Sequence, residues 1–145
     1  MALLEDIRTA IKTKADTDVA ALRRASLGRR RATGGLPQLF VAIPTFTMDS
    51  RPGGNVDRYD LTFPGYLEVG KPAGEKRADT EAADLLYALI VSWRSGIQLG
   101  LGASGVVGSW ISSASPDYSD DGMLVGYDLT WNVQMLETLS TGRTV

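Results

Sequence analysis

The chain contains neither cysteine nor histidine among its 145 residues. Zinc sites built on either residue and Ser–His–Asp triads are therefore excluded. Histidine is also the usual general acid or base near neutral pH, and only carboxylates, Lys, Tyr or Ser remain to replace it. The absence of cysteine also rules out a disulfide framework. We therefore expect a protein that is not an enzyme and that holds no cofactor and no metal.

Long hydrophobic runs are missing as well. The apolar run at 85–91 is much shorter than the roughly 20 residues that span a membrane, so no membrane contact is expected. The N-terminal sequence MALLEDIRTAIK carries acids where a signal peptide needs basic charge, and export is not expected. Hydrophobic residues make up 43% and charged residues 22%, as in globular proteins. The length predicts one domain, residues 1–145.

The most hydrophobic stretch is residues 79–93, DTEAADLLYALIVSW. One helical face collects Ala82, Leu85, Leu86, Leu89 and Trp93. Tyr87, Ile90 and Val91 make the other side apolar too, although a surface helix normally keeps a polar face. Burial of both sides within its own domain is one interpretation. Because such burial is hard to arrange in so short a chain, we infer instead that one side packs on a sheet and the other contacts a neighbouring subunit.

Local signals place the ends of this helix. Asp79 is a suitable N-cap, and Glu81 and Asp84 add negative charge near the positive end of the helix dipole. These three acids are explained by helix capping better than by catalysis with paired carboxylates. Gly96 is a suitable stop signal after the C-terminus.

The remaining pattern predicts one further helix and about four strands. Residues 3–14 form an amphipathic helix, which 16–27 either extends or follows with a second piece. A strand is expected at 36–48, at an edge or bulged because of Pro37 and Pro44, and another at 59–69 with a bulge at Pro64-Gly65.

The C-terminal half supplies the other two strands. One begins at Val106 and reaches Ile111, and 112–122 is expected to be a loop or a long hairpin tip. Residues 123–135 alternate strictly between apolar and polar side chains, which predicts a long antiparallel strand with one buried face. The predicted fold class is therefore α+β, an antiparallel sheet of about four strands with helices on one face, in the order α-β-β-α-β-β.

Two short motifs are weak. Residues 100–105 match GxGxxG, and 102–105 match the GxxG of KH domains. The first motif should follow a strand and open a helix, and the second should join two helices. Here a helix precedes and a β-branched pair follows, so a flexible connection is favoured. Asp117, Asp120 and Asp121 precede Gly122, but no Glu follows at EF-hand spacing, and a solvated hairpin loop explains them better.

Positive charge is concentrated near the N-terminus. Residues 1–31 carry a net charge of +4, and the remainder carries −6. An exposed, Arg-rich segment is expected at about 23–35, and its basic side chains are Arg23, Arg24, Arg29, Arg30 and Arg31. Clustered Arg can bind phosphates, but no aromatic residue is interleaved for base stacking. Contact with nucleic acid, contact with a subunit or partner, and simple solubility all remain open for this segment.

The order of these elements resembles a known family. The N-terminal helix precedes a strand that begins Leu36-Pro37-Gln-Leu-Phe-Val-Ala-Ile. A second strand at 59–69 leads into a helix that begins Ala78-Asp79-Thr-Glu-Ala-Ala-Asp. The last strand contains Tyr127-Asp-Leu-Thr-Trp-Asn-Val. Over roughly residues 1–138 this layout resembles the tail terminator (tail completion) proteins of long-tailed bacteriophages. Head-closure and other neck proteins share related layouts.

The resemblance implies a structural virion protein. Such a subunit forms a ring, in this family a hexamer, that caps the tail tube, ends its polymerisation and joins the tail to the head. Its partners would be itself, the tail tube protein and a head-closure or neck protein, with DNA passing through. Its place would be the virion tail or neck, after assembly in the host cytoplasm. Tyr87, Ile90, Val91 and the five Arg residues are the candidate subunit or partner contacts. The competing hypothesis is a small α+β module that binds nucleic acid through its Arg-rich segment.

Overall fold

The computed structural model describes residues 4–20, 22, 24–27, 37–49, 56–70, 75–118 and 124–138. In these residues the helices are α1 (Leu4–Asp18) and α2 (Glu75–Ser92), with a short 3-10 helix, η1 (Gly102–Ser104). The strands are β1 (Arg24–Leu27), β2 (Gln38–Val41), β3 (Thr45–Asp49), β4 (Val56–Gly70), β5 (Val106–Tyr118) and β6 (Leu124–Thr138). Within the same residues, no helix is both long and apolar enough to cross a membrane.

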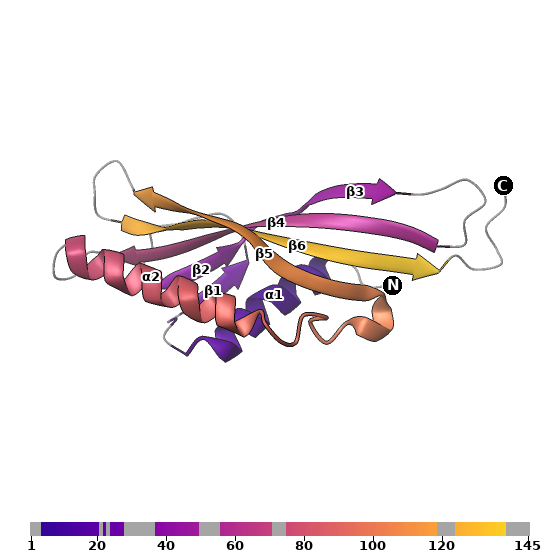
Figure 1. Cartoon of the computed structure of the whole chain (residues 1–145), viewed down its shortest axis with the longest axis horizontal. Coiled ribbons are helices and arrows are strands. Elements are labelled where there is room, and N and C mark those ends of the chain that lie inside the picture. The colour runs from indigo at the N-terminus through magenta and orange to yellow at the C-terminus, as the bar shows by residue number, and fades with distance from the viewer. Residues whose placement is uncertain are drawn as a thin grey trace.

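The described strands form one twisted sheet in the order β1-β2-β4-β6-β5, and β3 pairs with β4 beside β2. Strand β1 runs parallel to β2, and the other pairs are antiparallel. Both helices cover the same face: α1 packs against β1 and β2, and α2 packs against β4 and β6 (Figure 1). The α+β class and the helices on one face are confirmed. The described sheet has six strands, more than the expected four or so, because 36–48 is divided in two and 24–27 is also a strand.

The predicted bulge at Pro64-Gly65 is wrong, because β4 pairs with β6 without a register shift. The irregularity lies on the other neighbour of β4. Gly65 pairs with Val41 and Thr62 pairs with Thr45, so the β2–β3 side holds one extra residue. Ala42 N donates to Pro64 O at 2.8 Å, so the proline nitrogen, which has no hydrogen to donate, also points to the break between β2 and β3. The break between β2 and β3 therefore leaves no backbone N–H of Pro64 without a partner.

The core lies between the sheet and the two helices. The alternation predicted for the last strand is confirmed, since β6 buries Val125, Leu129, Trp131, Val133 and Met135. Trp131 is fully buried at the centre of the sheet. Its ring lies over Gly65, where a Cβ atom would stand 2.2 Å from Trp131 Cζ3. Only glycine leaves room for the indole at this position.

Several predicted element ends are wrong. Helix α2 begins at Glu75, so Asp79 lies in its second turn and is not the N-cap. Helix α1 ends at Asp18, so 16–27 neither extends the helix throughout nor forms a second one. For 112–122, the structure agrees with the long hairpin and not with the loop, because β5 continues to Tyr118 and pairs with β6. Long hairpin strands tolerate small polar residues on a solvated face.

Arg8 is a charged residue of α1 that is nevertheless buried. It is only 9% exposed, and its Nε donates to Val41 O at 3.0 Å while Nη1 contacts Glu5 Oε1 at 3.1 Å. Val41 is the last residue of β2, where the ladder stops. The guanidinium therefore satisfies a buried carbonyl at the end of a strand.

Candidate functional site

Helix α2 has one buried face and one exposed apolar face. Among its described side chains, the buried ones are those of Ala82, Leu85 and Leu89. On the opposite side Tyr87 is 61% exposed, Ile90 40% and Val91 41%, and Arg94 is exposed just beyond the helix. The spacing i, i+3, i+4 and i+7 aligns these four side chains in one stripe. We call Tyr87, Ile90, Val91 and Arg94 the outer stripe.

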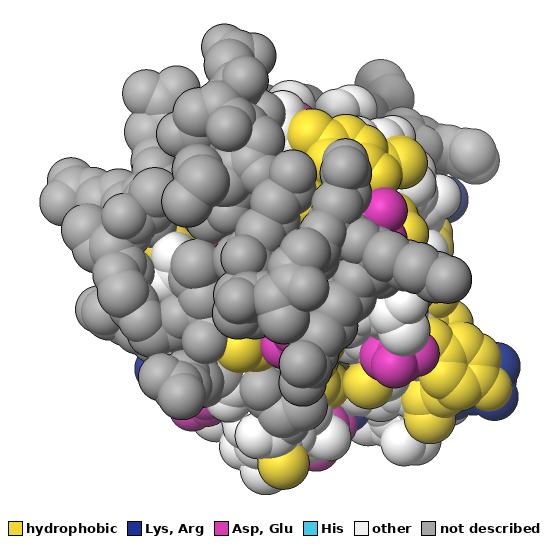
Figure 2. Space-filling model, turned by 90° about the vertical axis from the view of Figure 1, so that its left-hand side faces the viewer, with side chains coloured by type: hydrophobic (Ala, Val, Ile, Leu, Met, Phe, Trp, Pro, Cys, Tyr) yellow, Lys and Arg dark blue, Asp and Glu magenta, His cyan; other side chains and the backbone are white. Residues whose placement is uncertain are grey.

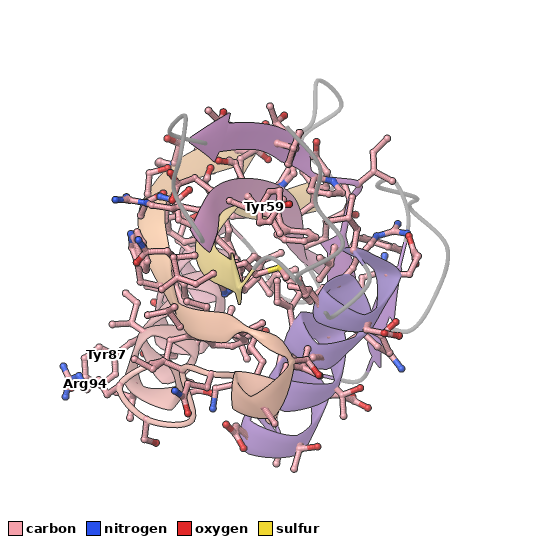
Figure 3. The ribbon with its side chains drawn as sticks, turned by 90° about the vertical axis from the view of Figure 1, so that its right-hand side faces the viewer. Tyr59, Tyr87 and Arg94 are labelled. Atoms are coloured by element: carbon pink, nitrogen blue, oxygen red, sulfur yellow. The ribbon has the colours of Figure 1, made fainter. Side chains whose placement is uncertain are left out.

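The outer stripe faces away from the rest of the molecule. Figure 3 shows Tyr87 and Arg94 projecting together from α2, on the side away from α1, whereas Tyr59 lies among the strands. In the opposite view of Figure 2, hydrophobic side chains with a basic group behind them project at the corresponding lower edge. An apolar group flanked by a cation is therefore presented to solvent at one side of the subunit.

The C-terminal end of α2 is fixed to the sheet, so the outer stripe is held rigidly. The rings of Trp93 and Trp131 are 5.4 Å apart between centroids and tilted by 54°. Trp93 Nε1 donates to Ser109 Oγ at 3.0 Å, and Ser109 Oγ donates to Ile97 O at 2.8 Å. These bonds join α2, the connection that follows it and β5 at one buried point.

A second set of contacts joins the C-terminal ends of the two helices. Lys14 Nζ pairs with Asp18 Oδ2 at 2.8 Å and lies 5.3 Å from the centre of the Trp93 ring. Ser92 Oγ donates to the same Asp18 oxygen at 2.7 Å. The pKa of Asp18 is lowered below its ordinary value of 3.8. The hydrogen bond from Lys14 is the largest cause, and the hydrogen bond from Ser92 is the second. These contacts fix α1 relative to the outer stripe.

A groove of about 600 Å³ lies between α1 and residues 96–101. The α1 side contributes Asp6, Ala10 and Thr13, together with Asp18, and the other side contributes Leu99 and Leu101. We call this cavity the α1 groove.

The loop that forms one side of the α1 groove has an unusual backbone. Leu99 has a φ of 58°, in the left-handed region that a branched side chain rarely adopts. The turn is closed by hydrogen bonds from Leu99 N to Gly96 O at 3.0 Å and from Leu101 N to Gln98 O at 2.8 Å. Gly96, the predicted stop signal, has a φ of 63°. The loop therefore keeps two leucine side chains beside α1 at a conformational cost.

The weak motifs find no support in the described residues. Gly102 opens η1 and Val106 opens β5, so the glycine motif leads into a strand and not into the α-helix of a dinucleotide site. For the same reason the shorter GxxG does not join two α-helices. No group of three or more His, Cys, Asp or Glu within these residues is placed to hold a metal ion.

The predicted contact residues divide into two groups. Tyr87, Ile90 and Val91 lie together on the outer stripe. Arg24 lies on β1 at the edge of the described sheet, with its side chain outside the described atoms, and Arg23, Arg29, Arg30 and Arg31 lie outside the described residues. Asp120 and Asp121 also lie outside them.

Two features were missed at the sequence level. Arg94 could have been added to the stripe from its spacing, seven residues after Tyr87. The α1 groove depends on the approach of two segments distant in sequence, and no local signal indicates it.

Comparison with known proteins gives a likeness of fold. No protein-family profile matches the sequence, and no curated protein matches it. A chain from the solved structure described as the virion of a native gene transfer agent (GTA) particle superposes with a TM-score of 0.52 at 15% sequence identity. The match covers 90% of this chain and 95% of that chain. At this identity the likeness concerns the fold, over nearly the full length of both chains.

Proposed function

We propose that this chain is a structural virion protein whose subunits assemble into a closed ring, a hexamer, at the end of a phage tail tube. The ring ends tube polymerisation and provides the surface to which the head attaches. Its partners are copies of itself, the tail tube protein and a head-closure or neck protein, and DNA passes through it. It is assembled in the host cytoplasm and remains in the tail or neck of the virion. It performs no catalysis.

The observation that carries the proposal is the outer stripe. Tyr87, Ile90 and Val91 are large apolar side chains that are each at least 40% exposed and adjacent on one helix. Contiguous apolar surface of this kind marks an interaction site, and aromatic and Arg side chains are enriched at such sites. The fold likeness to a chain of a virion particle supports the same conclusion from an independent direction.

The proposal is tested with the purified chain. Native mass spectrometry and negative-stain electron microscopy should show closed rings of one stoichiometry. When the chain is added to a polymerising tail tube protein, the tubes should stop growing and carry a ring at one end. A monomer at high concentration that binds DNA in a salt-sensitive manner would contradict the proposal and favour a nucleic-acid-binding module.

A further inference from the structure

The outer stripe continues toward the start of α2 with an acidic residue. Asp84 lies three residues before Tyr87, so it falls on the same side of the helix, and it is exposed. Neither Asp84 nor Arg94 forms an ion pair within the described residues. This side of α2 therefore has a negative charge at one end, apolar side chains in the middle and a positive charge at the other end.

These side chains are placed symmetrically along the helix. Asp84 and Arg94 lie five residues before and after Leu89. Tyr87 and Val91 lie two residues before and after the same position. A second copy of α2 that runs in the opposite direction, centred at the same level, places each member of these pairs against the other.

We propose that, in the free chain, α2 pairs with the α2 of a second copy about a two-fold axis at the level of Leu89. Asp84 of each copy pairs with Arg94 of the other, and the apolar side chains between them are covered. Complementary charges of this kind fix the direction of a contact, and antiparallel helices also bring the opposite ends of their dipoles together. A parallel arrangement would instead bring like charges together at both ends.

The inference goes beyond the proposed ring, because it concerns the chain before a ring forms. A contact between two identical patches is complete with two copies and cannot add a third. It covers the same side chains that we assign to the ring, so a subunit makes either one contact or the other. The pairing keeps the apolar side chains out of water until a ring neighbour replaces the second copy.

The experiment uses two full-length variants, Asp84→Cys and Arg94→Cys. The chain has no cysteine of its own, so a disulfide between copies reports only on the introduced positions. In the two-fold contact, the two copies of residue 84 are separated by about 15 Å along the helix axis, whereas residue 84 of one copy faces residue 94 of the other. A disulfide needs Cα atoms within about 7 Å of each other. Both positions are exposed, so folding should be retained, and circular dichroism checks this.

Mild oxidation is carried out at concentrations below those at which rings form. Each variant alone should stay unlinked, and an equimolar mixture should give a disulfide-linked dimer on a non-reducing gel. The mixture keeps one of the two ion pairs, between the remaining Arg94 and the remaining Asp84. Arg94→Cys mixed with Ser113→Cys, an exposed position on β5, is the control and should stay unlinked.

Three results would overturn this contact while leaving the proposed function intact. They are a mixture that does not crosslink, variants that crosslink alone as readily as when mixed, and a control mixture that crosslinks equally well. A crosslinked mixture together with a wild-type chain that forms no rings at any concentration would uphold the contact and contradict the proposed function.

Discussion

The indole nitrogen of Trp93 donates a buried hydrogen bond to the hydroxyl of Ser109 at 3.0 Å. Trp93 follows the last turn of α2 and Ser109 lies on β5, so this bond fixes the exposed helix to the sheet. Ser109 is itself buried and passes its own hydrogen to Ile97 O. The surface that we assign to assembly is therefore attached to the sheet through buried hydrogen bonds.

Replacing Ser109 with Ala should destabilise the fold. The substitution leaves the buried indole N–H without an acceptor, which costs about 1–3 kcal/mol in the free energy of unfolding. Urea unfolding followed by tryptophan fluorescence measures the loss. Ser115→Ala is the matched control, because Ser115 is exposed on the same strand and its replacement should change the stability little. Equal effects of the two substitutions would show that the Trp93–Ser109 bond does not stabilise the fold.

Gly65→Ala should be destabilising because of Trp131. The added Cβ would meet the indole at 2.2 Å, and the fully buried ring has little freedom to move, so overpacking should cost about 1–3 kcal/mol. Gly108→Ala is the control, since its Cβ would stand 3.4 Å from Ile97 Cδ1, an ordinary contact. In a Trp131→Leu background the Gly65→Ala penalty should shrink. If Gly65→Ala costs as much stability in the Trp131→Leu background as in the parent chain, the cause is the backbone conformation of residue 65 and not contact with the indole.

Asp18 makes the stability depend on pH in a defined direction. Its pKa in the folded state is lowered by the hydrogen bonds from Lys14 and Ser92, so the ionised carboxylate is favoured by folding. The resulting stabilisation is fully present above the ordinary pKa of 3.8 and is lost as the pH falls through the lower folded-state value. Asp18→Asn should therefore be less stable than the parent chain at neutral pH, and the difference should narrow in acid.

Chemical unfolding at neutral pH and at a pH below 3.8 tests this dependence. Asp16→Asn, which removes an exposed carboxylate two residues earlier, serves as the control. A stability difference for Asp18→Asn that stays constant across both pH values would show that the carboxylate charge is not the source.

Arg8→Met should remove a hydrogen bond that holds α1 to the sheet. The methionine keeps much of the apolar stem but leaves Val41 O without its donor, which costs about 1–3 kcal/mol. Lys12→Met on the same helix is the control, since Lys12 is only partly buried. Thermal melting of both variants gives the comparison, and equal melting temperatures would argue against a specific role for the guanidinium.

The elements with a clear hydrophobic period were predicted from the sequence. The alternation at 123–135 gave β6 and its buried face, and the helical spacing around Leu85 and Leu89 gave the buried side of α2. Residues 24–27 could not be predicted as a strand, because four residues among arginines and glycines carry no period. The start of α2 was missed because Asp79 is a good cap by residue type, whereas the helix begins earlier, at Glu75.

The candidate site was predictable only in part. The apolar residues Tyr87, Ile90 and Val91 can be recognised from sequence. A helix that is buried on one side normally has polar residues on the other side, and these three are apolar. The buried role of Arg8 and the shape of the α1 groove depend on where β2 ends and on a left-handed Leu99. Both arise from contacts between segments that are distant in sequence, which no local pattern encodes.

Sedimentation velocity measures whether the outer stripe holds subunits together in a ring. The wild-type chain at micromolar concentration and physiological salt should sediment as one closed oligomer. Tyr87→Glu combined with Ile90→Glu should sediment as a folded monomer, while Ser113→Glu, an exposed position on β5, should retain the oligomer. A wild-type chain that sediments as a monomer, or a Tyr87→Glu, Ile90→Glu variant that sediments as the intact oligomer, would show that the outer stripe does not hold subunits in a ring.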